Sequence, residues 1–338
     1  MRVTLRPLVA ALLVTEILVA CVGSDPEFPL GPGGPSSTSE DGGSEGGASE
    51  PTDTDGGLEA TVDAAPCDLA KPFGEPVPAP GVNDPNGGDD RSFRLTADGL
   101  YGIVDSKRVD DTAFRPYAVS RASTADAFSN PMRLTDLVSL PQLSSYVGFP
   151  VLTPDGLGVY FIVSTSGTGP DVWEARRTSR AGLFGDLTFV AALSSSGVEG
   201  APWLLRDQSQ IFFSRIDQGT STPYVSVADI QGGAFANVRA AEGLSSSDGN
   251  DRPVVSDDGL TIYFSSRRSS TASDANIWRA QRSSTTSPFG APTLVTELNS
   301  ELDDEPSWLS PDGCTIYFSS NRAGSSGGYD VFVATRPK

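Results

Sequence analysis

Acidic side chains recur at one place in the sequence pattern, just before a series of short apolar runs. Carboxylates in such a pattern could do three kinds of chemistry. Two of them across a glycosidic bond can hydrolyse a glycan, their oxygens can bind Ca²⁺, and an acidic patch can recruit basic partners. The alternative is that loop acids only solvate the loop and cap turns. The candidates are Asp89, Asp90, Glu199, Asp251, Asp303, Asp304 and Glu305.

The composition excludes several other function classes. The chain has no histidine, which removes histidine-based triads, the usual zinc sites and imidazole acid–base catalysis. No phosphate-binding loop and no G-x-S-x-G element occurs. The 24 Lys and Arg residues against 43 Asp and Glu residues, a net charge of −19, argue against nucleic acid binding, which needs a basic surface. We therefore expect no cofactor, with Ca²⁺ as the one ion to consider.

The elements that must position these acids form a repeat. An Asp-Gly turn, in which Asp caps the turn and Gly accepts a positive φ, precedes a β-branched and aromatic run typical of a buried strand. The run after Asp312-Gly313, for example, contains Thr315-Ile316-Tyr317-Phe318. The turns recur at intervals of roughly 50 residues, at Asp98-Gly99, Asp155-Gly156, Asp258-Gly259 and Asp312-Gly313, with a degenerate copy at Asp207-Gln208.

A second marker recurs with a similar spacing. It is a Phe before a small residue, and it opens a further extended segment. Between the two markers lies a strand with a central aromatic residue, so each unit carries about four short strands. Four strands per unit at this period predict a β-propeller blade. The marker residues are Phe73, Phe128, Phe184, Phe235 and Phe289.

The phase of the repeat predicts how the ring closes. The chain ends after the third strand of its last unit, and the segment from Lys71 to Asn83 resembles the fourth-strand segment from Ser287 to Asn299. We therefore expect the N-terminal strand to complete the last blade, which leaves no free edge. The fold class is all-β, a five-bladed propeller of four-stranded blades, with six blades as the alternative.

The N-terminal part is expected to be a signal and a tether. Residues 1–20 contain Arg2 and Arg6 and then an apolar stretch, as in a secretory signal peptide. The stretch ends in Leu18-Val19-Ala20-Cys21, which resembles a bacterial lipobox and implies lipidation of Cys21; the alternative is an ordinary signal peptide. Residues 21–66 are rich in Gly, Ser and acids and predict a disordered tether, and residues 67–338 form the propeller domain.

The other two cysteines are expected to pair. Cys67 precedes the orphan strand and Cys314 opens the second strand of the last unit, so ring closure would bring both to one blade. An exported chain is in a compartment that permits disulfides. We predict a Cys67–Cys314 disulfide, with two free thiols as the alternative.

Charged and aromatic strand residues also lead to structural predictions. Arg108, Arg268 and Arg322 follow second strands and are expected to pair with groups near the third strand. Those groups are Asp110 for the first, Asp274 or Asn276 for the second, and Asp330 for the third. The four tryptophans in strand patterns are expected to fill the core between blades: Trp173, Trp203, Trp278 and Trp308.

The pattern EPSWLSPDG…IYFSSNR…YDVFVATR at the end of the chain resembles the WD40-like, TolB-type propeller repeat, and the full layout resembles myxobacterial lipoproteins. This resemblance implies a non-enzymatic envelope lipoprotein. Val22 follows Cys21 in place of the Asp that retains lipoproteins at the inner membrane, which favours the outer membrane, on its periplasmic or surface face. The protein would be held by its N-terminal lipid and would bind a protein or glycan on one propeller face as a monomer. Some five-bladed propellers resemble glycosidases, so a glycan-acting hydrolase that uses channel carboxylates is the alternative.

Overall fold

The computed structural model describes residues 67–108, 111, 113–138, 146–164, 169–268 and 274–338. The signal sequence, the lipidated Cys21 and the tether expected for residues 1–66 lie outside the described residues and stay predictions. Within the described ranges, no helix has both the length and the apolar character needed to cross a membrane.

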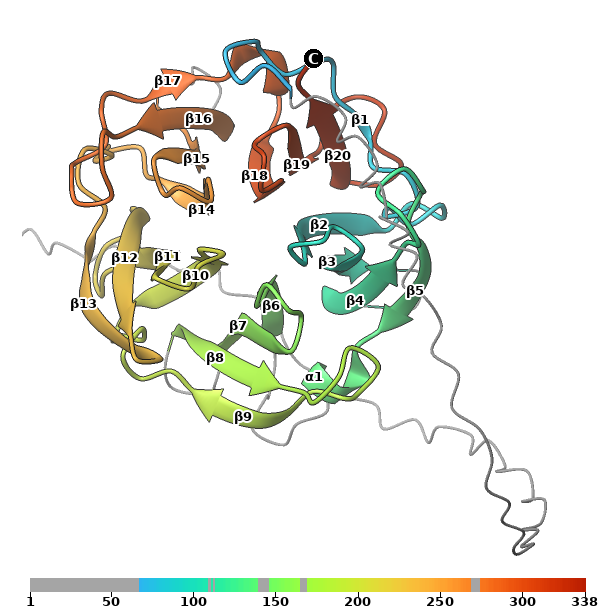
Figure 1. The fold of residues 1–338 in the computed structure, drawn as a ribbon, viewed down its shortest axis with the longest axis horizontal. Helices are drawn as coiled ribbons and strands as arrows, with labels where there is room; N and C mark the ends of the chain where they lie inside the picture. The colour runs from blue at the N-terminus through green and yellow to red at the C-terminus, as the bar shows by residue number, and fades with distance from the viewer. Residues whose placement is uncertain (1–66, 109–110, 112, 139–145, 165–168, 269–273) are drawn as a thin grey trace, which may run out of the picture. The chain divides into compact units, whose positions relative to one another are not determined.

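Five four-stranded antiparallel sheets are arranged in a ring, which confirms the all-β class and the five blades. In each blade the first strand lies nearest the centre and the fourth lies at the periphery (Figure 1). Short helices, α1 (Thr135–Val138) and the 3₁₀ helix η1 (Thr296–Leu298), lie between blades. The strands, from blade 1 to blade 5, are β2 (Asp89–Leu95), β3 (Tyr101–Lys107), β4 (Arg115–Ser120), β5 (Ser129–Arg133); β6 (Tyr146–Leu152), β7 (Gly158–Ser164), β8 (Pro170–Arg176), β9 (Gly185–Phe189); β10 (Val198–Leu204), β11 (Gln210–Ile216), β12 (Tyr224–Gln231), β13 (Ala234–Ala240); β14 (Asp251–Val255), β15 (Thr261–Ser266), β16 (Asn276–Gln281), β17 (Thr293–Leu294); and β18 (Asp304–Leu309), β19 (Thr315–Ser320), β20 (Asp330–Thr335), β1 (Val77–Pro78).

The N-terminal strand closes the ring as the repeat phase predicts. β1 pairs with β20, with Val77 opposite Val333 and Pro78 opposite Phe332. The Cys67–Cys314 disulfide is present, with its Cα atoms 5.6 Å apart. The strand is only two residues long, so the disulfide reinforces a short backbone connection.

The second strands carry the deepest core residues. The position six residues after the Asp of each turn is fully buried in every blade, with 0% exposure. Burying a side chain of this size stabilises the fold by roughly 1.5–3 kcal/mol, and the period-2 pattern of a strand keeps this position on the buried face. The residues are Val104, Phe161, Phe213, Phe264 and Phe318.

Tryptophans on the innermost strands connect neighbouring blades. Trp203 Nε1 donates to the carbonyl of Val255 at 3.0 Å, and Trp308 Nε1 donates to the carbonyl of Leu95 at 3.1 Å. Each bond joins the first strand of one blade to the first strand of the next. The prediction that these two tryptophans serve the contact between blades is therefore confirmed.

An arginine at the end of the third strand joins the two sequence markers. In blade 4, Arg282 Nε donates to the carbonyl of Gly259 at 2.7 Å, and its guanidinium carbon lies 4.6 Å from the centre of the Phe289 ring. The same contacts recur for Arg121, Arg177 and Arg336 with the Gly and Phe of their own blades. Blade 3 has Ile230 at this position, where its N–H donates to the carbonyl of Ser209.

These arginines also contact the preceding blade. Arg336 donates to the Tyr263 hydroxyl at 2.9 Å, and Arg177 donates to the Tyr101 hydroxyl at 3.2 Å. Each arginine therefore fixes its turn and links two blades. We call the end of the ring that carries these turns the turn face, and the opposite end, where the first strands begin, the start face.

Candidate functional site in the central channel

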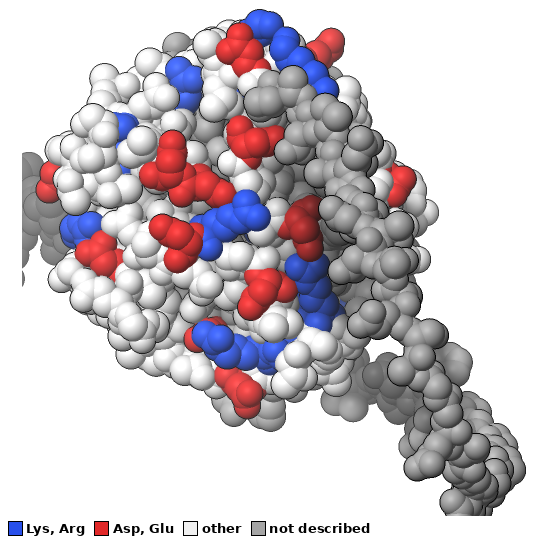
Figure 2. All heavy atoms as spheres, viewed as in Figure 1, with Lys and Arg blue, Asp and Glu red and all other residues white. Residues whose placement is uncertain are grey.

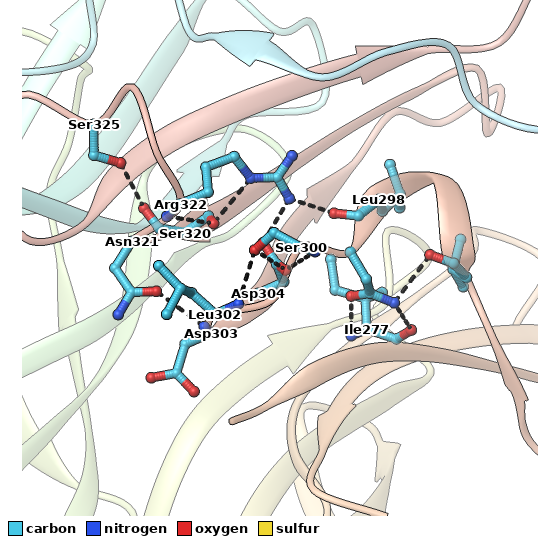
Figure 3. Close-up of polar contacts among 12 residues, drawn as sticks. Ile277, Leu298, Ser300, Leu302, Asp303, Asp304, Ser320, Asn321, Arg322 and Ser325 are labelled. Atoms are coloured by element: carbon cyan, nitrogen blue, oxygen red, sulfur yellow. Dashed lines mark hydrogen bonds and ion pairs between the residues drawn. The ribbon is translucent and has the colours of Figure 1, made fainter. Parts of the chain in front are cut away.

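The start face carries one buried acid–arginine contact in most blades, and Figure 3 shows the example in blade 5. Arg322 Nη2 lies 2.6 Å from Asp304 Oδ1 and donates to the carbonyl of Leu298 at 2.5 Å. The carboxylate also accepts hydrogen bonds from the backbone and hydroxyl of Ser300 at 2.5 and 2.9 Å. Asp304 is fully buried, so Arg322 and Ser300 balance its charge and no solvent-facing oxygen is left for a ligand.

Two other predicted acids make the same contact. Asp90 lies 3.6 Å from Arg108, and Glu199 lies 3.0 Å from Arg215. Both carboxylates are at most 1% exposed. Burial raises the pKa of Asp90 to about 6, although hydrogen bonds and the charge of Arg108 act in the opposite direction. The structure therefore assigns these acids to internal contacts.

The partners of Arg322 and Arg268 differ from those expected. Arg322 pairs with Asp304 on the first strand, not with Asp330 near the third. Arg268 donates to Asn250, which precedes the first strand of blade 4. Arg108 pairs with Asp90, whereas Asp110 lies outside the described residues. The physical reason is that an arginine after the second strand lies beside the start of the adjacent antiparallel first strand.

Asp89 and Asp303 hold the loop before β20. Asp89 Oδ1 accepts the backbone N–H groups of Gly328 and Tyr329 at 2.7 and 3.1 Å. Asp303 accepts the Tyr329 hydroxyl at 2.6 Å and the N–H of Ala275 at 2.7 Å. Burial, then the hydrogen bond to Asp303, raises the pKa of Tyr329 far above its usual range. Tyr329 is therefore a neutral hydrogen-bond donor.

Of the last two predicted acids, Glu305 meets an arginine of the neighbouring blade and Asp251 meets a serine hydroxyl. Arg252 Nη1 lies 2.8 Å from Glu305 Oε2, and the Ser214 hydroxyl donates to Asp251. Burial raises the pKa of Glu305, and the charge of Arg252 opposes that shift. The guanidinium carbon of Arg91 lies 3.7 Å from the centre of the Phe114 ring. The channel end at the start face thus has mixed charge.

Two buried charged residues of blade 1 were not revealed by the sequence patterns, and one of them, Arg94, borders the channel pocket. Arg94 on β2 is 2% exposed and Asp105 on β3 is 1% exposed. Asp105 accepts the backbone N–H of Phe149 at 2.7 Å, and burial raises its pKa to about 7. Burial lowers the pKa of Arg94 to about 9. For Arg94 the available signal was a charged residue at a strand position that holds Trp203 and Trp308 in other blades.

A bulge in the first strands decides which side chains reach the channel. The register of β2 shifts between Arg91 and Arg94, and Ser92 inside the bulge has a φ of 54°. Ala201 and Arg252 occupy the same left-handed region in blades 3 and 4, with φ values of 42° and 53°. A bulge interrupts the alternation of side chains along a strand. The face of the sheet on which an acidic side chain lies therefore cannot be inferred by counting residues from the end of the strand.

The turn face contains two adjacent openings. A pocket of about 50 Å³ at the channel end is lined by Arg94, Trp203, Trp308 and leucines of the first strands. A larger groove of about 1000 Å³ lies between blades 1 and 5 and shares Trp308 with that pocket. Within the described ranges, no group of three or more acidic or cysteine side chains has the spacing of a metal site.

Comparison with protein-family models finds no match. Comparison with curated proteins finds none either.

Solved structures share the propeller fold at low sequence identity. A GH43_1 enzyme from Xanthomonas citri in complex with xylotriose has a TM-score of 0.55 and 12% identity, over 77% of this chain and 90% of that chain. A thermostable family-43 glycoside hydrolase has a TM-score of 0.52 and 12% identity, over 74% and 90%. TolB from Acinetobacter baumannii has a TM-score of 0.44 and 17% identity, over 74% of this chain and 55% of that chain. The two family-43 structures therefore share the fold of this chain.

Proposed function

We propose that this chain is an exported envelope lipoprotein whose propeller binds a protein or glycan partner on its turn face, without catalysis. The groove between blades 1 and 5 carries this proposal. Its volume of about 1000 Å³ is at the upper end of the range typical of ligand sites. Apolar groups and charged groups of both signs line it, as in sites that combine affinity with orientation. Those residues include Pro80, Trp308, Tyr317, Asp98, Arg121 and Asp312.

The mixture of positive and negative side chains on the surface favours specific contacts over general attraction of oppositely charged molecules. Acidic and basic side chains lie interspersed around the centre of the viewed face (Figure 2). On the turn face, Arg180 lies 2.6 Å from Asp98, and Arg206 lies 3.3 Å from Asp257. A mixed surface selects partners by matching individual charges, which favours specificity over non-specific capture of basic molecules.

Glycan hydrolysis is the second candidate, and one observation favours it. Burial raises the pKa values of Glu305 and Asp105, that of Asp105 to about 7, and a raised pKa is what a carboxyl needs to act as a general acid. Against it, Glu305 is held by Arg252 at 2.8 Å. Hydrolysis of arabinoxylan or peptidoglycan fragments that disappears in Glu305→Gln would establish this second function.

Affinity capture with the full chain tests the binding proposal. Solubilised envelope is passed over the immobilised protein, with and without Ca²⁺, and retained material is identified by mass spectrometry. Ala127→Arg fills the groove with a long cation, because Ala127 is exposed and lines it. Ala234→Arg on the exposed outer strand of blade 3 is the matched control. A partner lost with Ala127→Arg but kept with Ala234→Arg supports the proposal; equal retention by both variants contradicts the assignment of the groove.

The lipid anchor is tested separately. Cys21→Ser removes the proposed attachment site, so labelled palmitate should enter the wild-type chain and not the variant. The wild-type chain should also sediment with membranes, because more than one acyl chain holds a protein firmly. Membrane association that persists in Cys21→Ser would contradict the anchor.

A further inference from the structure

Arg94 is a buried cation with unused hydrogen-bond donors. Its side chain is 2% exposed, and its Nε and Nη1 atoms have no hydrogen-bond partner among the described residues. No Asp or Glu side chain of the described residues lies within ion-pair distance of it. A buried charge without a partner is costly, and proteins normally compensate it with an anion or a polar network.

The surroundings of Arg94 leave that compensation incomplete. Asp105 supplies the nearest opposite charge, but one of its oxygens accepts the N–H of Phe149 and the other, Oδ1, has no hydrogen-bond partner. Arg252 adds a second positive charge that acts on Arg94. Trp203 lies beneath the guanidinium, with its ring centre 5.0 Å from the Arg94 carbon. The site therefore favours an added anion.

A passage from the surface leads to Arg94. The channel pocket on the turn face is lined by Arg94 and by apolar walls that include Leu95, Val151 and Trp308. At its outer end the charges of Arg206 and Asp257 pair with each other at 3.3 Å, so neither charge is left alone to attract or repel an anion. The groove between blades 1 and 5 adjoins this pocket and shares Ala97, Trp308 and Pro311 with it.

We propose that this pocket binds an acidic side chain, or a chain-terminal carboxylate, of a protein partner, with Arg94 as the receptor. A guanidinium has the planar fork that matches a carboxylate. The pocket volume of about 50 Å³ admits a carboxylate on a slender aliphatic chain and is too small for the ring of an acidic sugar. Apolar walls disfavour a strongly hydrated phosphate. The inference deepens the proposed function, because it names the chemical group by which the partner is recognised.

Butyrate, which has the shape of a glutamate side chain, is the first probe. Binding to the full chain is followed by tryptophan fluorescence, since Trp203 and Trp308 line the pocket. We expect saturable binding with a dissociation constant on the order of 1 mM, and none by neutral butyramide, galacturonate or phosphate at equal ionic strength. Absence of saturable butyrate binding, or equal binding of galacturonate, would overturn the inference.

Substitutions locate the receptor. Arg94→Gln should weaken butyrate binding at least about tenfold, and Arg94→Lys, which keeps the charge but loses the fork, should weaken it several-fold. Arg282→Gln is the matched control, because it removes a half-buried arginine of the turn-face contacts that does not line the channel pocket. Unchanged binding in Arg94→Lys overturns the assignment even where Arg94→Gln does not fold.

Partner capture separates this inference from the proposed function. Butyrate in excess should release a captured protein from the wild-type chain, and Arg94→Lys should retain less of it. A partner retained equally under both conditions overturns the role of Arg94 and leaves the binding function in place. Failure of the wild-type chain to retain any protein or glycan overturns the proposed function, whatever butyrate does.

Discussion

The disulfide that closes the ring should contribute a large part of the stability of the propeller. Cys67 and Cys314 are 247 residues apart, so the bond restricts almost the whole unfolded domain. The chain-entropy relation gives about 5 kcal/mol for a loop of this length. Without the bond, the N-terminal segment keeps the two-residue pairing of β1 with β20 and a few backbone contacts such as Ala79 N–H to Val331 O at 2.8 Å. We expect the double substitution Cys67→Ser, Cys314→Ser to lower the free energy of unfolding by up to about 5 kcal/mol.

Urea unfolding followed by tryptophan fluorescence measures this effect. With a slope of about 3 kcal/mol per molar urea, the midpoint should fall by about 1.5 M. Reduction of the wild-type chain should produce the same shift. Cys21→Ser is the control, because it removes a thiol outside the described domain and should leave the midpoint unchanged. A midpoint equal to that of the wild type in the double variant would refute the entropic argument.

Three further predictions concern the contacts within and between blades. Arg282→Ala removes the hydrogen bond to Gly259 at 2.7 Å and an aromatic contact, and should cost about 2 kcal/mol in urea unfolding; a loss below a few tenths would contradict its role. Trp308→Phe leaves the carbonyl of Leu95 without its indole donor and should cost about 1–3 kcal/mol by the same assay, and a neutral result would show that water replaces the bond. Burial raises the folded-state pKa of Asp105 to about 7 from an ordinary value of 3.8, so its protonated form stabilises the fold at low pH and this contribution is lost as the pH rises from about 4 through 7. Asp105→Asn should flatten that part of the pH–stability profile, and an unchanged profile would show that another group titrates.

The blade architecture could be predicted because its signals are local. A turn such as Asp312-Gly313 needs a positive φ, and Gly313 adopts one of 70°. The apolar run that follows it forms β19 (Thr315–Ser320). The phase of the repeat then predicted ring closure by the N-terminal segment, since an unfinished last unit and an orphan first strand fit only one arrangement.

The candidate site could not be predicted in the same detail. It depends on which face of a strand each side chain lies on and on contacts between blades. Asp90 and Glu305 both precede or begin first strands, yet Asp90 pairs inside its blade with Arg108, whereas Glu305 pairs with Arg252 of the neighbouring blade. A bulge shifts the alternation within these strands. Arg94 looked like an ordinary strand residue, because nothing local reveals that it lies at the channel.

The position of the disulfide determines how the propeller would carry mechanical load. If the chain is anchored through its N-terminus, a pull on the propeller reaches it at Cys67. The covalent bond to Cys314 passes that force directly to the start of β19, an inner strand paired on both sides. The two-residue β1 lies beyond this point and is shielded from the tension. Reduction would move the same force onto the backbone contacts that follow Cys67, such as Asp68 N–H to the carbonyl of Pro337 and Gly74 N–H to the carbonyl of Thr335, and then onto β1. Loss of these contacts would separate β1 from β20 and open the last blade.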